Sequence, residues 1–336
     1  MAIKVAVNGF GRIGKLVVRA AFERGMVGKD FDIVAINDTH DPKLSAHLFM
    51  YDSTQGRHTG SAKGEAGKLT IDGHEIVLTA DRDPANLPWG KLGVDVVLEC
   101  TGAFTDRAGA SKHISAGAKK VLISAPCKSG EADATIVLGV NDSKYDRKKH
   151  NIVSLGSCTT NCLAPVAKTL LDNFGIESGF MTTIHAYTND QLILDAHHKD
   201  FRRARSGAMN IIPTTTGAAK AIGEVVPELK GKLDGLSLRV PTPVGSINDL
   251  SCTLGKAATK EEINSALKKA AQGKLKGIME YCEDPIVSSD IVHNPSSSIV
   301  DAGTTIAIGK SAKVLSWYDN EWGFSNRMVE LAGRMM

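Results

Sequence analysis

Two side chains near the middle of the sequence, Cys158 and His185, carry the chemistry of a nucleophile and a base. Cys158 begins a predicted helix over residues 158–174, where unpaired N–H groups and the helix dipole favour a thiolate. The thiolate, and not the thiol, is the nucleophile of cysteine. The position alone fits a structural cysteine equally well. Structural roles are expected for the five cysteines in or beside apolar runs: Cys100, Cys127, Cys162, Cys252 and Cys282.

His185 lies in an otherwise apolar predicted strand over residues 179–187. An imidazole titrates near neutral pH and therefore suits a general base, although a histidine on a strand can equally serve the structure. His197 and His198 stand side by side in a predicted loop, but no cysteine or carboxylate at ligand spacing completes a zinc site. We therefore expect no metal.

Gly9, Gly11 and Gly14 form a G-x-G-x-x-G pattern between a short apolar run and a predicted helix. Glycines at this spacing permit a tight turn, let the backbone approach a pyrophosphate and bring the helix close to the sheet. Asp38 ends the next predicted strand, where a carboxylate binds ribose hydroxyls and repels a 2′-phosphate. The pattern predicts NAD as the cofactor, against the simpler interpretation of a βα turn with a capping Asp.

The elements that must position these residues change in type along the chain. Up to about residue 155, short apolar runs alternate with helical patterns, which predicts a doubly wound parallel sheet of Rossmann type. Strands are predicted over residues 3–8, 31–37, 94–98, 121–124, 136–140 and 152–155, helices over 12–24, 42–50 and 107–118, and a hairpin over 68–78.

The second half of the chain has longer alternating runs and fewer helices, which predicts an α+β domain with a mostly antiparallel sheet. Strand character is predicted over residues 179–187, 233–254 and 298–318, and helices over 158–174, 215–226, 260–272 and 325–334. Leu236 and Leu238 alternate with Ser237 and Arg239, so Arg239 is predicted on the polar side of its strand, in solvent.

Composition excludes several classes of protein. The chain has 336 residues, and 40 Lys and Arg against 37 Asp and Glu give a net charge of +3. A dedicated nucleic-acid binder needs a larger basic excess, and no apolar run reaches the ~18 residues of a membrane span. The start of the sequence also lacks a secretory signal, because glycines interrupt its first apolar run. Six cysteines are too few for a disulfide scaffold, which predicts free thiols and a cytoplasmic protein.

These motifs together resemble the glyceraldehyde-3-phosphate dehydrogenase family, of the phosphorylating glycolytic kind. The resemblance covers essentially the whole chain, and SCTTNC is highly specific for the family. The matching stretches are VNGFGRIG (7–14), AIND (35–38), YDSTQG (51–56), ECTGAF (99–104), ISAP (123–126), SCTTNCLAP (157–165), TTIHAYTND (182–190), NIIPTTTGAAKAIG (210–223), LRVPTP (238–243) and SWYDNEWGFSN (316–326).

The resemblance implies the oxidation of D-glyceraldehyde 3-phosphate with NAD and inorganic phosphate to 1,3-bisphosphoglycerate. Cys158 is implied as the nucleophile that carries a thiohemiacetal and a thioester, and His185 as its base. The implied site for inorganic phosphate comprises Ser157, Thr159, Thr216 and Gly217. The implied site for the substrate phosphate comprises Thr188, Asp190 and Arg239. Arg205 matches best as a further anion contact, whereas Arg202 and Arg203 are expected in solvent or at subunit contacts.

The resemblance also implies the cofactor contacts and the domains. Beside the three glycines, the implied NAD contacts are Arg12, Ile13, Asp38, Arg82, Thr101, Ser124 and, at the nicotinamide carboxamide, Asn320. Residues 1–157 form the implied NAD-binding domain, and residues 158–319 the catalytic and oligomerisation domain. The C-terminal helix, about residues 320–336, returns to the first domain, and the implied assembly is a homotetramer.

Three residues depart from the pattern of the NAD-specific members. Thr39 follows Asp38 where these members often carry an apolar residue, and Ala196-His197 replaces the common Leu-Pro. Small Ala196 leaves room for a 2′-phosphate, so secondary use of NADP is expected beside NAD.

Three other functions compete with this interpretation. An erythrose-4-phosphate dehydrogenase or an NADP-linked form would use the same nucleophile. A cysteine acyltransferase or hydrolase would use Cys158 and His185 without redox chemistry, and the glycine pattern argues against it. A nucleic-acid or interaction role finds no support in the near-neutral charge.

Overall fold

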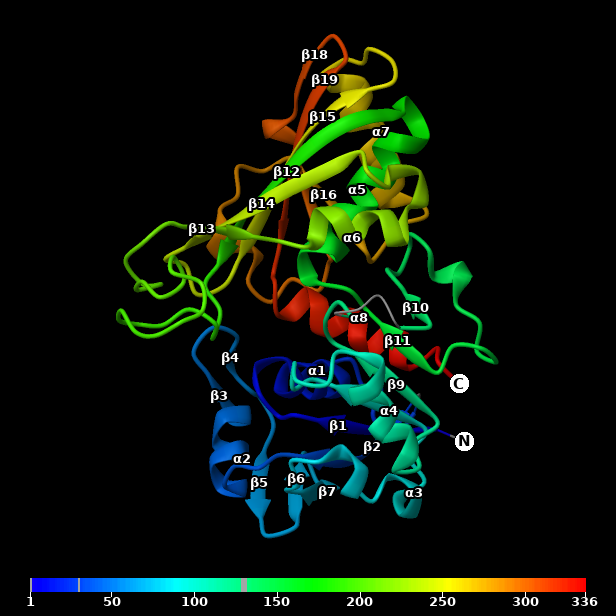
Figure 1. Ribbon diagram of the computed structural model, residues 1–336, viewed down its shortest axis with the longest axis vertical. Coiled ribbons are helices and arrows are strands. Elements are labelled where there is room, and N and C mark those ends of the chain that lie inside the picture. The colour runs from blue at the N-terminus through cyan, green and yellow to red at the C-terminus, as the bar shows by residue number, and fades with distance from the viewer. Residues whose placement is uncertain (1, 30, 128–131) are drawn as a thin grey trace. The chain divides into compact units, whose positions relative to one another are not determined.

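A computed structural model describes residues 2–29, 31–127 and 132–336. The chain divides into two compact units (Figure 1): unit 1 comprises residues 1–136, 143–156 and 325–336, and unit 2 comprises residues 137–142 and 157–324. The sequence alone suggested a division after residue 157 and a return at about residue 320. The compact units divide after Gly156 and after Phe324.

Within the described residues, unit 1 contains a nine-stranded sheet in the order β10-β11-β9-β8-β1-β2-β7-β6-β5. Its strands are β1 (Ile3–Asn8), β2 (Phe31–Asn37), β5 (Ala62–Glu65), β6 (Lys68–Ile71), β7 (His74–Thr79), β8 (Val96–Glu99), β9 (Lys120–Ile123), β10 (Ala134–Thr135) and β11 (Ile152–Ser154). The other elements are α1 (Arg12–Glu23), α2 (Pro42–Met50), α3 (Trp89–Leu92), α4 (Arg107–Ser115), the small hairpin β3 (Tyr51–Asp52) and β4 (Gly56–Arg57), and most of α8 (Trp322–Ala332).

The strands from β10 to β7 run parallel, and the order of connection reverses on the two sides of β1. The predicted doubly wound sheet is therefore confirmed. The predicted hairpin over residues 68–78 is also present, because Asp72 and Gly73 join β6 to β7 with φ values of 48° and 81°. The C-terminal helix packs within unit 1, where Arg24 at the end of α1 pairs with Glu330 of α8 at 2.7 Å.

The strand predicted over residues 136–140 is wrong. Strand β10 covers only Ala134–Thr135, and the next residues form a turn that belongs to unit 2. The Asn141 side chain accepts a hydrogen bond from the Val137 N–H at 2.8 Å, and Gly139 has a φ of +79°. The apolar run is buried all the same, because an apolar run signals burial but does not by itself specify a strand.

The main sheet of unit 2 has the order β13-β14-β12-β15-β19-β17-β16, and β18 pairs with β19. Its strands are β12 (Ile176–Ala186), β13 (Ile212–Thr215), β14 (Leu233–Val240), β15 (Ser246–Leu254), β16 (Met279–Cys282), β17 (Ser298–Asp301), β18 (Ile306–Ile308) and β19 (Ser311–Tyr318), and its helices are α5 (Cys158–Phe174), α6 (Ala218–Val225) and α7 (Lys260–Gln272). Only the β12–β14 and β16–β17 pairs are parallel, so the sheet is mostly antiparallel, as predicted.

Helices α5, α6 and α7 lie along one face of this sheet (Figure 1), and their apolar side chains form the core of unit 2 with that face. Helix α7 begins with a capping box between Thr259 and Glu262, as its sequence predicts. The covered face of β14 is the one that carries Ser237, which is 2% exposed, whereas Leu236 on the other face is 44% exposed. The prediction that Arg239 faces solvent is therefore wrong, since Arg239 shares the covered face with Ser237.

Candidate active site

Cys158 is the first residue of α5, and the N-cap Ser157 fixes the start of that helix. The Ser157 side chain accepts a hydrogen bond from the Thr160 N–H at 3.0 Å, and the extended backbone of Ser157 turns the chain into the helix. The thiol is half-buried, and its sulfur lies 3.6 Å from Nε2 of His185. The structure therefore brings together the two residues that the sequence singled out as nucleophile and base.

His185 and Arg239 lie side by side because β12 and β14 pair in parallel with these two residues opposite each other. Nδ1 of His185 is 2.7 Å from the carbonyl oxygen of Ala186 and 3.0 Å from an NH1 nitrogen of Arg239. The same NH1 group donates to the Ala186 carbonyl at 3.3 Å. The imidazole is 4% exposed, so its orientation is determined by these neighbours.

Burial is the largest influence on the pKa values of Cys158 and His185. It raises the pKa of the Cys158 thiol above its ordinary value, and the opposing influence of Arg239 and Thr159 only reduces that shift. The helix start was predicted to favour a thiolate, and the structure differs because desolvation of the charged form outweighs the helix end. Burial and the charge of Arg239 lower the pKa of His185 to about 3.

Tyr318 is a residue of this site that the sequence reasoning did not single out. Its buried hydroxyl lies 2.9 Å from the hydroxyl of Thr159 and 2.8 Å from that of Thr183, and its ring meets the His185 ring edge-on. Burial raises the pKa of Tyr318 well above its ordinary value, which keeps the hydroxyl neutral. Tyr318 joins the start of α5 to strand β12. The only signal in the sequence was its place in the SWYDN stretch.

The residues expected at the substrate phosphate are Arg239, Thr188 and Asp190, and each has different partners. Nε of Arg239 is buried and has no hydrogen-bond partner in the described part of the chain. The backbone N–H of Thr188 donates to the side-chain oxygen of Gln191 at 2.8 Å. Asp190 accepts from Arg203 at 2.6 Å and lies 3.3 Å from His198. Asp190 thus contributes negative charge and orients Arg203.

Arg202, Arg203 and Arg205 lie in the loop after His198, which we call the basic loop. The exposures of Arg203 and Arg205 differ from those expected. The side chain of Arg205 is 63% exposed and pairs with Asp195 at 2.5 Å. The side chain of Arg203 is only 20% exposed, donates to the Thr214 hydroxyl at 2.9 Å and acts electrostatically on Arg239. Arg203, which was expected in solvent or at subunit contacts, is therefore less exposed than Arg205 and acts electrostatically on Arg239.

Two expected residues of the inorganic-phosphate site lie just before α6. The hydroxyl of Thr216 accepts a hydrogen bond from the Ala218 N–H at 3.2 Å, and Thr216 is half-buried. Gly217 is exposed and is the N-cap of α6, without a side chain that could cap the helix. Both belong to unit 2, as do Ser157 and Thr159.

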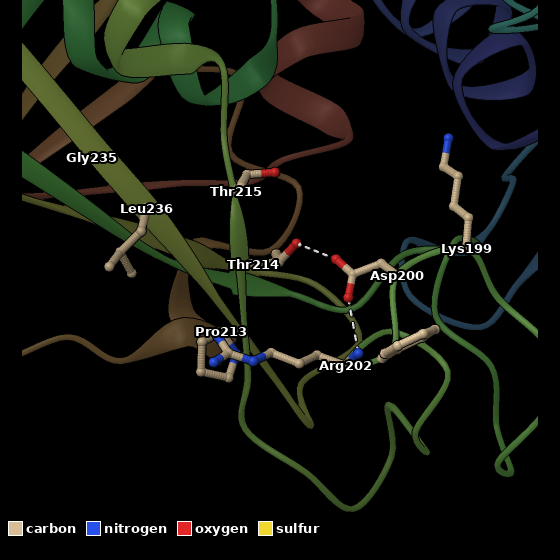
Figure 2. Close-up of a pocket in the computed structure, with 9 residues that line it drawn as sticks. Lys199, Asp200, Arg202, Pro213, Thr214, Thr215, Gly235 and Leu236 are labelled. Atoms are coloured by element: carbon tan, nitrogen blue, oxygen red, sulfur yellow. Dashed lines mark hydrogen bonds between the residues drawn. The ribbon is translucent and has the colours of Figure 1, made fainter.

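A further hollow of unit 2, of about 550 Å³, is lined by residues of the basic loop and of strands β13 and β14 (Figure 2). Asp200 stands in its wall, where it accepts hydrogen bonds from the Thr214 hydroxyl at 3.2 Å and from the Arg202 N–H at 2.9 Å. Neither Cys158 nor His185 lines this hollow, which opens instead beside exposed Leu236.

In unit 1 the expected cofactor residues gather at one edge of the parallel sheet. The glycine turn follows β1, Asp38 follows β2, Thr101 follows β8, Ser124 follows β9 and Arg82 follows β7. Because the carboxyl ends of parallel strands meet at the same edge, residues distant in sequence come together there. The position where the strand order reverses, at β1, is the usual place for a dinucleotide.

The glycine turn fits a pyrophosphate. Gly9 has a φ of +92°, and a Cβ there would lie 2.7 Å from the Thr101 side chain. A Cβ on Gly14 would lie 2.0 Å from the Gly9 carbonyl oxygen, so α1 approaches the turn too closely for any side chain. A Cβ on Gly11 would meet no atom within 4 Å, and Gly11 provides no side-chain cap for α1. This open space at a helix start is suited to a phosphate group.

Asp38 is 5% exposed and held by its own loop. One oxygen accepts from the Ser45 hydroxyl at 2.5 Å, and the other lies 2.7 Å from Nδ1 of His40. Burial by itself would raise the pKa of Asp38, but the hydrogen bonds from Ser45 and His40 outweigh it and lower the pKa. Asp38 is therefore a carboxylate that its own loop holds in place and whose charged form these contacts favour. Sequence reasoning missed Ser45 and His40, although both follow Asp38 closely.

The remaining expected cofactor residues are placed as follows. Arg12, at the start of α1 with Ile13, pairs with Asp52 and donates to the Thr54 hydroxyl at 2.6 Å. Arg82 is exposed, whereas Ser124 is half-buried. Thr101 donates its N–H to the buried carboxylate of Glu99 at 2.8 Å. Asn320 belongs to unit 2, where its side-chain oxygen accepts from the Ser246 hydroxyl at 3.0 Å.

Two further structural findings concern metals and membranes. Over residues 2–29, 31–127 and 132–336, no group of three or more His, Cys, Asp or Glu side chains could hold a metal ion. Among the helices of the same residues, none combines the length and apolar character of a membrane span.

A parallel dinucleotide-type sheet and a second unit with a paired cysteine and histidine are features of a dehydrogenase. Residues 3–107 match the family model "Glyceraldehyde 3-phosphate dehydrogenase, NAD binding domain", and residues 157–320 match "Glyceraldehyde 3-phosphate dehydrogenase, C-terminal domain". The chain is 57% identical over 332 residues to glyceraldehyde-3-phosphate dehydrogenase 2 of Streptomyces avermitilis, with 98% of each chain covered.

Two further relatives carry the same name. Glyceraldehyde-3-phosphate dehydrogenase of Geobacillus stearothermophilus is 56% identical and glyceraldehyde-3-phosphate dehydrogenase 1 of Bacillus subtilis is 55% identical, each with 99% of this chain and 98% of the relative covered. The chain belongs to the glyceraldehyde-3-phosphate dehydrogenase family. The match to the family's NAD binding domain also supports NAD as the cofactor.

The open space at Gly11 generates the first prediction. The φ of −75° at Gly11 suits alanine, so Gly11→Ala should fold normally and fill the space meant for the pyrophosphate. We expect the Kd for NAD to rise about tenfold or more, equivalent to ~1.4 kcal/mol or more, with an unchanged melting temperature of the cofactor-free protein. Titration calorimetry and thermal unfolding measure both. Gly14→Ala is the contrasting variant and should lower the melting temperature. Melting temperatures lowered equally in Gly11→Ala and Gly14→Ala would contradict this account.

The fixed carboxylate of Asp38 generates the second prediction. The wild type should prefer NAD to NADP in kcat/KM by roughly 10- to 1000-fold, because a 2′-phosphate would meet a like charge. Asp38→Gly should narrow this ratio mainly by improving NADP. Steady-state rates with both cofactors measure the ratio. The control is Asp41→Asn, which removes an exposed charge in the same loop and keeps a side-chain cap for α2. A wild type that prefers NADP would refute the role of Asp38.

Proposed function

We propose that this chain oxidises D-glyceraldehyde 3-phosphate with NAD and inorganic phosphate, and forms 1,3-bisphosphoglycerate and NADH through a thioester on Cys158. The observation that carries the chemical part is the contact of 3.6 Å between the Cys158 sulfur and Nε2 of His185. The family of the chain and the names of its relatives support the substrate.

In the first step Nε2 of His185 takes the proton of the Cys158 thiol, and the sulfur forms a bond to the aldehyde carbon. The carbonyl oxygen becomes the hydroxyl of a hemithioacetal when it receives that proton. Burial disfavours the charged forms of both side chains, so we place the proton transfer together with the formation of the C–S bond.

In the second step His185 removes the hydroxyl proton, and the carbon keeps its bond to sulfur as a thioester. NAD, when bound, supplies the acceptor for the hydride that leaves the carbon. The proposed holders of NAD are the glycine turn, Asp38, Thr101, Ser124, Arg12, Ile13, Arg82 and Asn320.

In the third step an oxygen of inorganic phosphate attacks the thioester carbon, and the C–S bond breaks. Cys158 leaves as a thiolate and regains a proton. We propose Ser157, Thr159, Thr216 and Gly217 as the phosphate site, because hydroxyl and N–H donors suit a phosphate. Water must compete poorly at this carbon, since hydrolysis would lose the acyl phosphate.

We place the substrate phosphate at Arg239, supported by its buried Nε without a partner. Thr188 and Asp190 contribute to this site, Asp190 by holding Arg203. On the geometry, Arg203 replaces Arg205 as the proposed additional anion contact. A guanidinium that is largely buried interacts more strongly with a phosphate than one in solvent.

The assembly we propose is a homotetramer, because unit 2 leaves a large apolar surface uncovered. Phe180, Ile306 and Ile308 on the strands are 73%, 53% and 76% exposed. The segment 193–211 adds Ile193, Leu194, Phe201, Met209 and Ile211, each at least 66% exposed. Apolar patches of this kind mark interfaces in globular proteins. We also propose a cytoplasmic location, supported by six free cysteines, which suit a reducing compartment.

The test of the function is NADH formation from D-glyceraldehyde 3-phosphate, measured at 340 nm with and without inorganic phosphate. Cys158→Ser should abolish it, and His185→Asn should lower the acylation rate by about 10²- to 10⁴-fold. Cys252→Ser, at a buried thiol whose pKa burial raises to about 11, is the matched control and should retain turnover. Oxidation that continues without phosphate at the full rate would indicate hydrolysis, and D-erythrose 4-phosphate as the better substrate would refute the assignment.

Sedimentation tests the assembly. The wild type should sediment as a tetramer at micromolar concentration, and Ile308→Asp with Phe180→Asp should shift it to smaller species, because two charges would enter the apolar surface. Lys310→Asp, exposed near the same strands, is the control. A wild type that stays monomeric would contradict the proposal.

A further inference from the structure

Tyr318 belongs to a chain of three buried hydroxyl groups that come from three elements of unit 2. Its hydroxyl oxygen lies 2.8 Å from that of Thr183 on β12 and 2.9 Å from that of Thr159 in the first turn of α5. Thr183 and Tyr318 are each 1% exposed, and Thr159 is 5% exposed. Within residues 2–29, 31–127 and 132–336, the Thr183 hydroxyl has no hydrogen-bond partner other than Tyr318. The chain therefore ends at Thr183.

The direction of the hydrogen bonds in this chain follows from that buried end. A hydroxyl donates one hydrogen bond and can accept two. Thr183 must donate its proton to the Tyr318 oxygen, because a buried donor without an acceptor costs the desolvation of that group. The proton of Tyr318 then has only the Thr159 oxygen as its acceptor. The proton of Thr159 is the one that the chain leaves unused.

The unused proton stands next to the nucleophile, because Thr159 directly follows Cys158 at the start of α5. The side chain and the N–H of Thr159 both act to lower the pKa of the Cys158 thiol, against the larger effect of burial. A donor lowers the pKa of a thiol when it binds the charged form. The Thr159 hydroxyl is thus a donor to the sulfur.

We propose that Tyr318 is a positioning residue for the Cys158 thiolate, and that with Thr183 it keeps the Thr159 hydroxyl as a donor to the sulfur. The inference goes beyond the proposed function, since it concerns the free nucleophile and holds without cofactor or substrate. In the free protein the donor favours the thiolate that reacts with a carbonyl carbon. In the proposed third step it favours the same thiolate when the sulfur leaves the thioester.

The backbone holds both ends of the chain in place. Thr183 of β12 lies opposite Asn248 of β15 in the antiparallel pairing. The fully buried Asn248 side chain donates to the backbone carbonyl oxygen of Thr159 at 3.2 Å. The start of α5 is therefore tied to the part of the sheet that carries Thr183, and the fold sets the positions of both threonines beside Tyr318.

Cys158 also faces groups that can carry charge. They are His185 on β12, Arg239 on β14 and Cys162 one turn further along α5. The influence of His185 changes when its imidazole titrates, whereas the hydroxyl chain carries no charge. Burial raises the pKa of Tyr318 well above its ordinary value, so Tyr318 keeps its proton over the range in which the thiol titrates. The chain should therefore act on the thiol at every pH of that range.

The pH dependence of alkylation tests the proposal, because the thiolate and not the thiol reacts with iodoacetamide. Alkylation of Cys158 is followed by mass spectrometry without cofactor or substrate. Tyr318→Phe keeps the ring against His185, removes only the hydroxyl and should raise the midpoint pH by about 0.5 to 1. Thr159→Val removes the donor itself and should raise the midpoint by about 1 to 2. Tyr281→Phe, at a half-buried tyrosine of the same unit, is the control and should change nothing.

A double variant decides whether Tyr318 acts through Thr159. In the Thr159→Val background, Tyr318→Phe should cause no further change, because the contact between the two hydroxyls is already lost. Thr159→Ser, which keeps a hydroxyl, should react like the wild type. An unchanged midpoint in Tyr318→Phe, or an equal rise in both backgrounds, would overturn the proposal. NADH formation tests the proposed function separately, so either proposal can fail while the other stands.

Neutron diffraction from wild-type crystals grown in heavy water shows the same arrangement without any variant. We expect the deuterium of Thr183 to point to Tyr318, that of Tyr318 to Thr159 and that of Thr159 to the sulfur. A deuterium of Thr159 that points to Tyr318 would overturn the proposal, even if Tyr318→Phe does not fold.

Discussion

The chemistry of this protein depends on one constraint, the parallel pairing of β12 with β14. It sets His185 beside the positively charged Arg239. The first turn of α5 completes the arrangement by bringing Cys158 within 3.6 Å of the ring. Because the group is buried, its protonation states depend on a few fixed neighbours.

The rest of unit 2 serves to hold this arrangement in place. Helices α5, α6 and α7 pack on one face of the sheet and form the core with it, so the start of α5 cannot shift along β12. Tyr318 adds a polar connection through the hydroxyls of Thr159 and Thr183. The opposite face carries exposed Phe180 and Leu236, which a stable chain in solution would need to cover.

Unit 1 provides a different kind of site from that of unit 2. For the NAD cofactor of its family, unit 1 offers backbone at the carboxyl edge of a parallel sheet and one carboxylate that its own loop holds in place. Gly9 and Gly14 permit the close approach of α1 to the turn, and Asp38 is held in place by Ser45 and His40. The guanidinium of Arg12, at the start of α1, is already paired with the carboxylate of Asp52.

Local signals of spacing, capping and alternation predicted most strands and helices and the glycine turn with Asp38. Those signals only singled out Cys158 and His185 as candidates, and the family resemblance carried their assignment. The predicted strand over residues 136–140 is a buried turn. The face of β14 that carries Arg239 was predicted to face solvent, but the helices cover it. Which face a strand buries depends on the helices packed against it, and hydrogen bonds between strands depend on register. Neither quantity is encoded within one segment, so the neighbours of His185, the hydrogen bonds of Tyr318 and the different exposure of Arg203 and Arg205 were decided only by the tertiary structure.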